Sequence, residues 1–288
     1  MKPYLTIVCA VSLWGTWPLW LRASRMGSGA QAFWSLALIG VLGLLASRLP
    51  RLRGRPARAG DAGLVVAMGV AAAVNQLAYF AAFESTTVAR AAMAHYLAPV
   101  LVAMLAPWVL RERFQWRVPM ALVVALGGLA LLLLERPAGG PTANDTLGVS
   151  LGLVSAVAYA AIVLCAKRLR PGLSAVWLVG AHCGLAAACA LPYLLATTTI
   201  VATINELAFL GLATWVAGFV PTVLFYGALA RVPAQHAAVL TYLEPVVSAV
   251  CAALFLAEAI GAQGLVGASC VLAAGVAVVV KSLSSAQG

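Results

Sequence analysis

Long apolar runs recur from one end of this chain to the other, each about 20 residues long, enough for a helix to cross the roughly 30 Å hydrocarbon core of a bilayer. Lipid offers a backbone amide no hydrogen-bond partner, so only helices and closed barrels span a membrane. The strict alternation of apolar and polar residues that marks barrel strands is absent from the sequence. Because 64% of the residues are apolar and only 9% are charged, we predict an all-α integral membrane protein.

The apolar runs predict ten transmembrane helices. The first run follows Lys2 and reaches Arg22 without a small-residue cleavage site, which predicts a retained span and not a signal peptide. The predicted spans are 4–21, 31–49, 62–83, 91–110, 118–134, 147–166, 175–195, 207–228, 236–256 and 262–280.

The distribution of cations predicts the orientation, since cytoplasmic loops retain an excess of Lys and Arg. With the N-terminus inside, 14 of the 18 cations fall on the cytoplasmic side, and both termini are predicted to be cytoplasmic. This topology explains the net charge of +10, so no nucleic-acid partner is expected. The predicted outer cations are Arg22, Arg25, Arg90 and Arg136.

Patterns typical of enzymes and metal sites are weak. The six cysteines all fall inside predicted spans without a C-x-x-C pair, and the chain has no zinc-ligand spacing and no phosphate or dinucleotide loop, so we expect no metal and no cofactor. The segment "GVSLG" (148–152) matches the G-x-S-x-G pattern of hydrolases, and an intramembrane protease would pair Ser150 with His182 or His236. However, this segment opens an apolar helix with no strand before it, where glycine and serine are ordinary helix contacts. We therefore expect no enzyme.

An internal repeat organises the chain. The segment "HYLAP" (95–99) returns as "TYLEP" (241–245) at an offset of 146, and an offset of 145 pairs Trp14 with Tyr159. Each copy holds five predicted helices. Because five is odd, the second copy must enter the membrane from the opposite side, which predicts two inverted repeats related by a pseudo-two-fold axis in the membrane plane.

The repeat boundaries are predicted at 1–136 and 137–288. Pro99 and Pro245 then lie about 12–14 Å deep, one approached from each face. A proline removes one backbone hydrogen bond and bends its helix, and in lipid the freed carbonyl needs a partner or a hydrated cavity. We predict that both prolines kink their helices and contribute to gating.

Polar side chains are predicted near the middle of the membrane. Glu244 is the deepest carboxylate, with Thr241 on the same helical face. A charge at that depth is costly unless it is neutralised, paired or hydrated, so Glu244 is either a proton-coupling group or a protonated glutamate bonded to backbone that Pro245 frees. His95 lies on the equivalent helix and is either a second titratable group or a packing residue. The third helix adds Asn75 and Tyr79, four residues apart, with Gln76 alongside.

Three segments resemble the EamA domains of the drug/metabolite transporter superfamily: "LWGTWP" (13–18), "YLAPVLVAMLAPWVLRE" (96–112) and "YLEPVVSAVCAALFLAE" (242–258). The resemblance covers nearly the whole chain and is nearest to the YddG-like amino-acid exporters. It implies ten helices, a central cavity and alternating access between the two halves. Those exporters carry an asparagine where this chain has His95 and a tryptophan where it has Ala98.

The main hypothesis is a secondary transporter that exports a small amphipathic metabolite, an aromatic or neutral amino acid, across a bacterial inner membrane. It is expected to act as a monomer in the lipid bilayer, with H⁺ coupling through Glu244 or His95. Multidrug or cation efflux, an uncoupled facilitator and a non-transporting scaffold are the alternatives. The predicted cavity residues are Trp17, Asn75, Tyr79, His95, Tyr96, Tyr159, Thr241 and Glu244.

Overall fold

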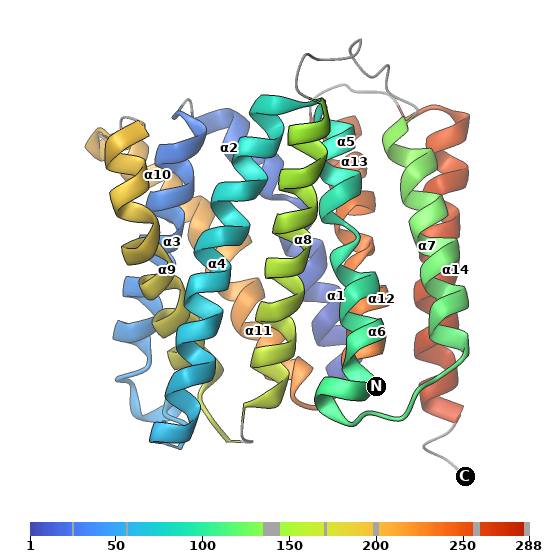
Figure 1. Ribbon diagram of the computed structural model, residues 1–288, viewed down its shortest axis with the longest axis horizontal. Coiled ribbons are helices and arrows are strands. Elements are labelled where there is room, and N and C mark those ends of the chain that lie inside the picture. The colour runs from blue at the N-terminus through green and yellow to red at the C-terminus, as the bar shows by residue number, and fades with distance from the viewer. Residues whose placement is uncertain are drawn as a thin grey trace.

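The computed structural model describes residues 1–24, 26–55, 57–134, 145–169, 172–197, 202–255 and 260–284. Within these ranges the regular elements are helices, standing side by side in one bundle (Figure 1). The helices are α1 (Lys2–Gly15), α2 (Trp17–Ser24), α3 (Ser28–Ala46), α4 (Ala59–Ser85), α5 (Val88–His95), α6 (Ala98–Leu110), α7 (Arg117–Leu134), α8 (Asp145–Arg168), α9 (Ala175–Thr197), α10 (Ile204–Ala213), α11 (Val220–Leu229), α12 (Ala234–Thr241), α13 (Leu243–Phe255) and α14 (Ala262–Ser284), with a 3-10 turn η1 (Pro50–Leu52) and a π-helical turn η2 (Thr214–Phe219).

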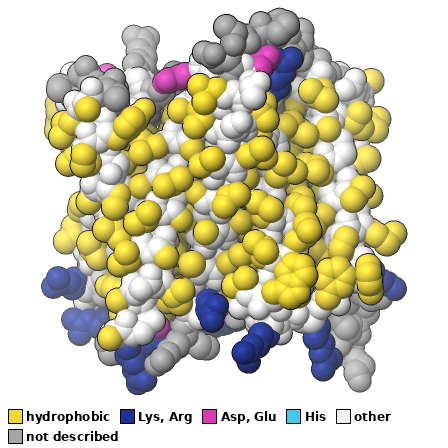
Figure 2. Space-filling model, in the orientation of Figure 1, with side chains coloured by type: hydrophobic (Ala, Val, Ile, Leu, Met, Phe, Trp, Pro, Cys, Tyr) yellow, Lys and Arg dark blue, Asp and Glu magenta, His cyan; other side chains and the backbone are white. Residues whose placement is uncertain are grey.

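Nine stretches of the described residues are long and apolar enough to cross a membrane, and they overlap the second to tenth predicted spans. The chain is thus a multi-pass membrane protein. Figure 2 shows a broad apolar belt, with Lys and Arg gathered at one edge and Asp and Glu near the other. The N label of Figure 1 and the C-terminal end of α14 both lie toward the basic edge. Five predicted loop charges, Arg25, Glu135, Arg136, Arg170 and Glu258, lie outside the described residues.

The first predicted span differs from the prediction. Instead of one helix over 4–21, the chain forms α1 and α2, which meet at Thr16. Pro18 is the second residue of α2 and has no N–H to donate, so a continuous helix would leave the carbonyl four residues earlier without its partner. The Thr16 hydroxyl donates to the Leu13 carbonyl at 2.7 Å and satisfies one of the groups at this break.

Three other predicted spans are interrupted, each within a few residues of a proline. The helix α5 ends at His95 and α6 begins at Ala98, with Pro99 as its second residue. The helices α12 and α13 are separated at Tyr242. Between α10 and α11 the chain widens into η2, and Pro221 follows as the second residue of α11. Such π-helical turns often occur at functional positions.

Helix pairs join the two halves of the chain. The helix α4 packs along α8, α1 along α11, α3 along α9 and α7 along α14. In the repeat register α1 corresponds to α8 and α4 corresponds to α10 and α11, so the first two pairs are equivalent to each other. The other two pairs each join a helix to its own repeat counterpart.

Glycines allow a close contact between α3 and α9. A Cβ atom on Gly43 would lie 2.5 Å from the Cα of Gly180, and one on Gly40 would lie 2.7 Å from the Cα of Gly184. Small residues let membrane helices approach until their backbones touch, where dispersion forces are largest. Through these glycines α3 and α9 pack closely at one side of the bundle (Figure 1).

At the basic edge, charged side chains hold the connection between α11 and α12. Both carboxylate oxygens of Glu112 accept from the Ala234 N–H, at 2.9 and 3.0 Å, at the start of α12. The Lys167 ammonium donates to the carbonyls of Leu229 and Val232, at 2.7 and 2.8 Å, at the end of α11. Each charge complements the helix dipole that it faces. These bonds hold the end of α11 and the start of α12 at the basic edge.

Candidate functional site

A cavity of about 310 Å³ lies inside the bundle, enclosed by helices of both halves. Its volume is in the range of pockets that hold small molecules. All eight predicted cavity residues line it, as does Pro99, whereas Pro245 is buried and does not. That these residues bind substrate, and that the two prolines act in gating, stays a prediction.

The lining reflects the internal repeat. Pairs of residues separated by 145 to 147 positions line the cavity, as expected if the two halves contribute equivalent helices. These pairs are Trp14 with Tyr159, Trp17 with Ile162, Ser35 with His182, Leu36 with Cys183, Gln76 with Thr222, Tyr79 with Phe225, Phe80 with Tyr226, His95 with Thr241 and Ala98 with Glu244.

A hydrogen-bonded group of three side chains forms a polar wall. The Asn75 amide on α4 donates to the hydroxyl of Ser155 on α8 at 2.9 Å, and also to the Ser155 carbonyl at 3.0 Å. The same hydroxyl lies 2.8 Å from Nδ1 of His95 at the end of α5. Three helices are therefore joined at one point, and Ser155 is fully buried at the junction.

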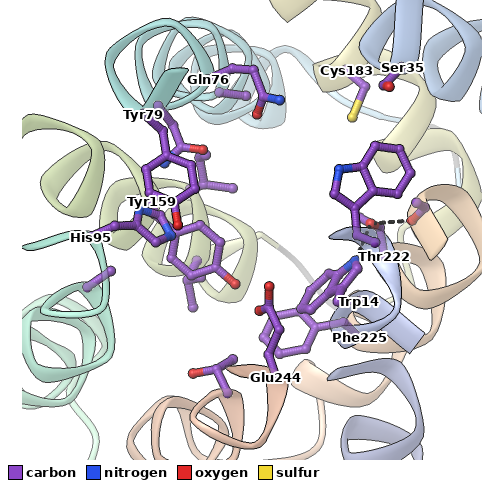
Figure 3. A pocket seen from close by; sticks show the side chains of 18 of the residues that line it. Trp14, Ser35, Gln76, Tyr79, His95, Tyr159, Cys183, Thr222, Phe225 and Glu244 are labelled. Atoms are coloured by element: carbon purple, nitrogen blue, oxygen red, sulfur yellow. Dashed lines mark hydrogen bonds between the residues drawn. The ribbon is translucent and has the colours of Figure 1, made fainter. Parts of the chain in front are cut away.

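Aromatic rings surround this group. The Tyr79 ring lies 4.2 Å from the His95 ring, centroid to centroid, and the Tyr159 ring meets His95 edge-on at 5.6 Å. On the other side of the space Trp14 packs against Phe225 at 5.0 Å. Figure 3 shows these two sides facing each other. Rings at such distances make favourable tilted or edge-on contacts and offer flat apolar surfaces to a bound molecule.

Glu244 reaches into the open space between the two sides (Figure 3). It is the second residue of α13, immediately after the break at Tyr242, and the break turns its side chain toward the cavity. Tyr96 lines the cavity together with Glu244, and the Tyr242 hydroxyl donates to the Tyr96 carbonyl at 2.8 Å. The two copies of the repeated segment thus touch, and Glu244 is the one carboxylate among the described residues that line the cavity.

A glycine makes this arrangement possible. Gly15, the last residue of α1, lies so close to α13 that a Cβ atom on it would sit 2.7 Å from the Glu244 carbonyl oxygen and 2.7 Å from the Val247 Cβ. The end of α1 therefore packs directly against the backbone of α13 at Glu244.

Sequence reasoning missed several lining residues. His182 was considered only as a protease base, yet it lines the cavity with Nδ1 2.8 Å from the Leu178 carbonyl and Nε2 3.4 Å from the Tyr226 hydroxyl. Ser155 does not line the cavity but orients two residues that do. Its signal in the sequence is only its position four residues before Tyr159, on the same helical face.

The chain also matches known proteins. Residues 1–134 and 146–280 match the EamA-like transporter family. The chain belongs to this family. An uncharacterized transporter of Archaeoglobus fulgidus is 31% identical to this EamA-like transporter over 201 residues, which are 68% of each chain. A solved crystal structure, titled only as that of a protein, superposes with a TM-score of 0.80 at 19% identity, covering 96% of this chain and 95% of the other, and shows the same fold.

The contacts in this EamA-like transporter give the protease alternative no support. Ser150 is exposed on α8, and within the part of the chain that the structure describes no basic side chain is hydrogen-bonded to it. His182 is engaged inside the cavity, and His236 lies at the basic edge between the Tyr4 hydroxyl, at 2.7 Å, and the Gln115 amide oxygen, at 2.9 Å. Among the described residues, no group of three His, Cys, Asp or Glu side chains could hold a metal ion.

Proposed function

We propose that this protein exports a small amphipathic metabolite, an aromatic or neutral amino acid, across the bacterial inner membrane by alternating access. The observation that carries the proposal is that one carboxylate and a polar wall line the same aromatic cavity. Glu244 offers a partner for an amino group, while Asn75 and His95 offer hydrogen bonds across the space. The rings of Tyr79 and Trp14 provide apolar surface for a side chain.

Alternating access requires two halves that move against each other around one site. Many lining residues are repeat counterparts of one another, so each half presents an equivalent surface to the substrate, which supports this mechanism. Within the same mechanism we propose that repeats 1–136 and 137–288 have inverted orientations in the membrane. We also propose that both termini are cytoplasmic and that the protein functions as a monomer.

Coupling to H⁺ is proposed through Glu244. A carboxylate that faces the substrate and then the opposite solution can load and release one proton in each cycle, and an arriving amino group competes for the same site. His95 is the second candidate for a proton carrier, since it lines the same space.

Export is tested in cells that express the full chain and are challenged with a panel of toxic aromatic and neutral amino-acid analogues. We expect increased tolerance with wild-type protein and loss of tolerance with Asn75→Leu, which removes a polar wall residue at similar size. Ser150→Ala, on the exposed side of α8, is the matched control and should behave as wild type. Unchanged sensitivity across the panel, with expression and membrane insertion verified, contradicts amino-acid export.

A second function, efflux of organic cations, is favoured by one observation. Among the described lining residues there is a carboxylate but no Lys or Arg, so a bound cation would be paired and a bound anion would not. Aromatic faces around Glu244 add cation–π attraction for an ammonium group. Competition for transport by quaternary amines, but not by amino acids, would select this function over the first.

A further inference from the structure

Ser155 controls what the polar wall presents to the cavity. Its carbonyl oxygen can only accept a hydrogen bond, so the Asn75 group that faces it at 3.0 Å is the NH₂ group and not the amide oxygen. This fixes the orientation of the Asn75 amide. The same NH₂ group donates to the Ser155 hydroxyl oxygen at 2.9 Å, which therefore acts as an acceptor toward Asn75.

The hydroxyl proton of Ser155 is then directed to His95. Nδ1 of His95 lies 2.8 Å from this oxygen, and no other partner of the hydroxyl is present among the described residues. When Nδ1 of a neutral imidazole accepts a hydrogen bond, the ring proton resides on Nε2. The chain of bonds from Asn75 through Ser155 to His95 thus fixes one tautomer of the histidine.

The resulting wall has a defined pattern of donors. His95 lines the cavity with an Nε2–H donor, and its ring is held by Tyr79 on its face and Tyr159 at its edge. The Glu244 carboxylate, an acceptor, lies across the same space (Figure 3). In a molecule that carries an ammonium group and, a few bonds away, a carboxylate, the ammonium group could bind Glu244 and the carboxylate could accept from His95.

We infer that Ser155 is a positioning residue that holds His95 as an uncharged Nε2–H donor for the substrate carboxylate, while Glu244 receives the ammonium group. The inference rests on the proposed function, because it names how an amino acid is oriented in the proposed site. It also separates an amino acid from the amine that lacks its carboxylate: only the amino acid uses the donor that Ser155 fixes.

Binding to the purified full-length protein tests this inference with matched ligands, tryptophan against tryptamine and phenylalanine against phenethylamine. Ser155→Ala should weaken binding of the amino acids about tenfold, the usual effect of losing a hydrogen bond to a charged group, and that of the amines by less than about twofold. Ser150→Ala, on the same helix, should change neither. Ser155→Cys, which keeps a weak donor at similar size, should fall between wild type and Ser155→Ala for the amino acids only.

A double-mutant cycle gives a readout that a purely structural role of Ser155 would not produce. In His95→Gln the side-chain amide donates without help from a neighbouring hydroxyl, so adding Ser155→Ala should no longer affect amino-acid binding. Equal losses for amino acids and amines, or full additivity in the cycle, overturns the role of Ser155. Wild-type protein that binds amines but not amino acids also overturns it and leaves cation efflux, whereas binding of neither class contradicts the proposed site as a whole.

Discussion

The two sides of the cavity occupy equivalent places in the repeat but are built differently. One side is the pair α4 and α8, which we call the continuous pair: 27 and 24 residues of uninterrupted helix. The other is α1 and α11 with the adjoining α2 and η2, which we call the interrupted pair. Prolines account for the difference, because Pro18 and Pro221 have Val163 and Asn75 as their repeat counterparts.

The chemistry follows the same division. The continuous pair carries the polar wall, Asn75 with Ser155, and holds His95 through it. The interrupted pair carries mainly rings, with one bond of 3.3 Å from the Trp14 indole to Thr222. Directional recognition needs a rigid support, whereas flat apolar contact tolerates movement. We therefore expect the continuous pair to select the substrate and the interrupted pair to move during transport.

The largest expected effect concerns Glu244, which stands between the two pairs. Glu244→Gln keeps size and hydrogen bonding but cannot release a proton, so transport driven by a pH gradient should fall to the level of protein-free liposomes while exchange without a gradient continues. Uptake of labelled substrate in proteoliposomes measures both. Glu84→Gln, at an exposed position at the end of α4, is the matched control. Full gradient-driven uptake in Glu244→Gln would show that coupling, if present, uses another group.

The second effect concerns the support of Glu244 by the interrupted pair. Gly15→Ala places a methyl group 2.7 Å from α13, and the overpacking should destabilise the fold by about 1–3 kcal/mol. Gly227→Ala, in α11 with open space around it, should instead be neutral or stabilising by up to about 1 kcal/mol. Thermal unfolding in detergent compares the two. Equal melting temperatures for Gly15→Ala and Gly227→Ala would mean that α1 can shift at Gly15 without loss of stability, and that its packing does not stabilise α13.

Much of the fold follows from the sequence because lipid allows few alternatives. The apolar runs were sufficient to predict the second to tenth spans. The break at Thr16 was missed because only prolines with a proline repeat partner, Pro99 and Pro245, were interpreted as kinks. Pro18 and Pro221 have no such partner, and their effect on the helix depends on which carbonyls the packing leaves free.

The candidate site was predictable where a residue is unusual for its surroundings. Polar side chains such as Asn75 and Glu244 are costly in lipid, which is why their place in the cavity could be expected. Ser155 carries no such signal, because serine packs readily between membrane helices. Its importance depends on α8 lying against both α4 and α5, a contact between segments about 60 to 80 positions apart that periodicity does not reveal. His182 does carry such a signal, because histidine is also costly in lipid, but it was considered only as a protease base.

The third prediction tests whether the interrupted pair moves. Pro221→Ala returns a backbone donor to the segment after η2 and favours a continuous helix. We expect turnover to fall about three- to tenfold, with substrate affinity within about twofold, because the conformational step and not the site is altered. Pro107→Ala, a proline inside α6 that does not line the cavity, is the control. A change in affinity without a change in turnover would assign recognition, not movement, to the proline segment.

The smallest expected effect concerns the bond inside the interrupted pair. Thr222→Val keeps the shape of the side chain but removes the acceptor of the Trp14 indole, a bond of 3.3 Å worth about 0.5–1.5 kcal/mol at most. If this bond only joins two moving helices, amino-acid affinity should change by less than about threefold, well below the loss in Asn75→Leu. Binding measurements on the two variants side by side decide the matter. Equal losses would mean that both sides of the cavity recognise the substrate through polar groups, and the division between a selecting pair and a moving pair would fail.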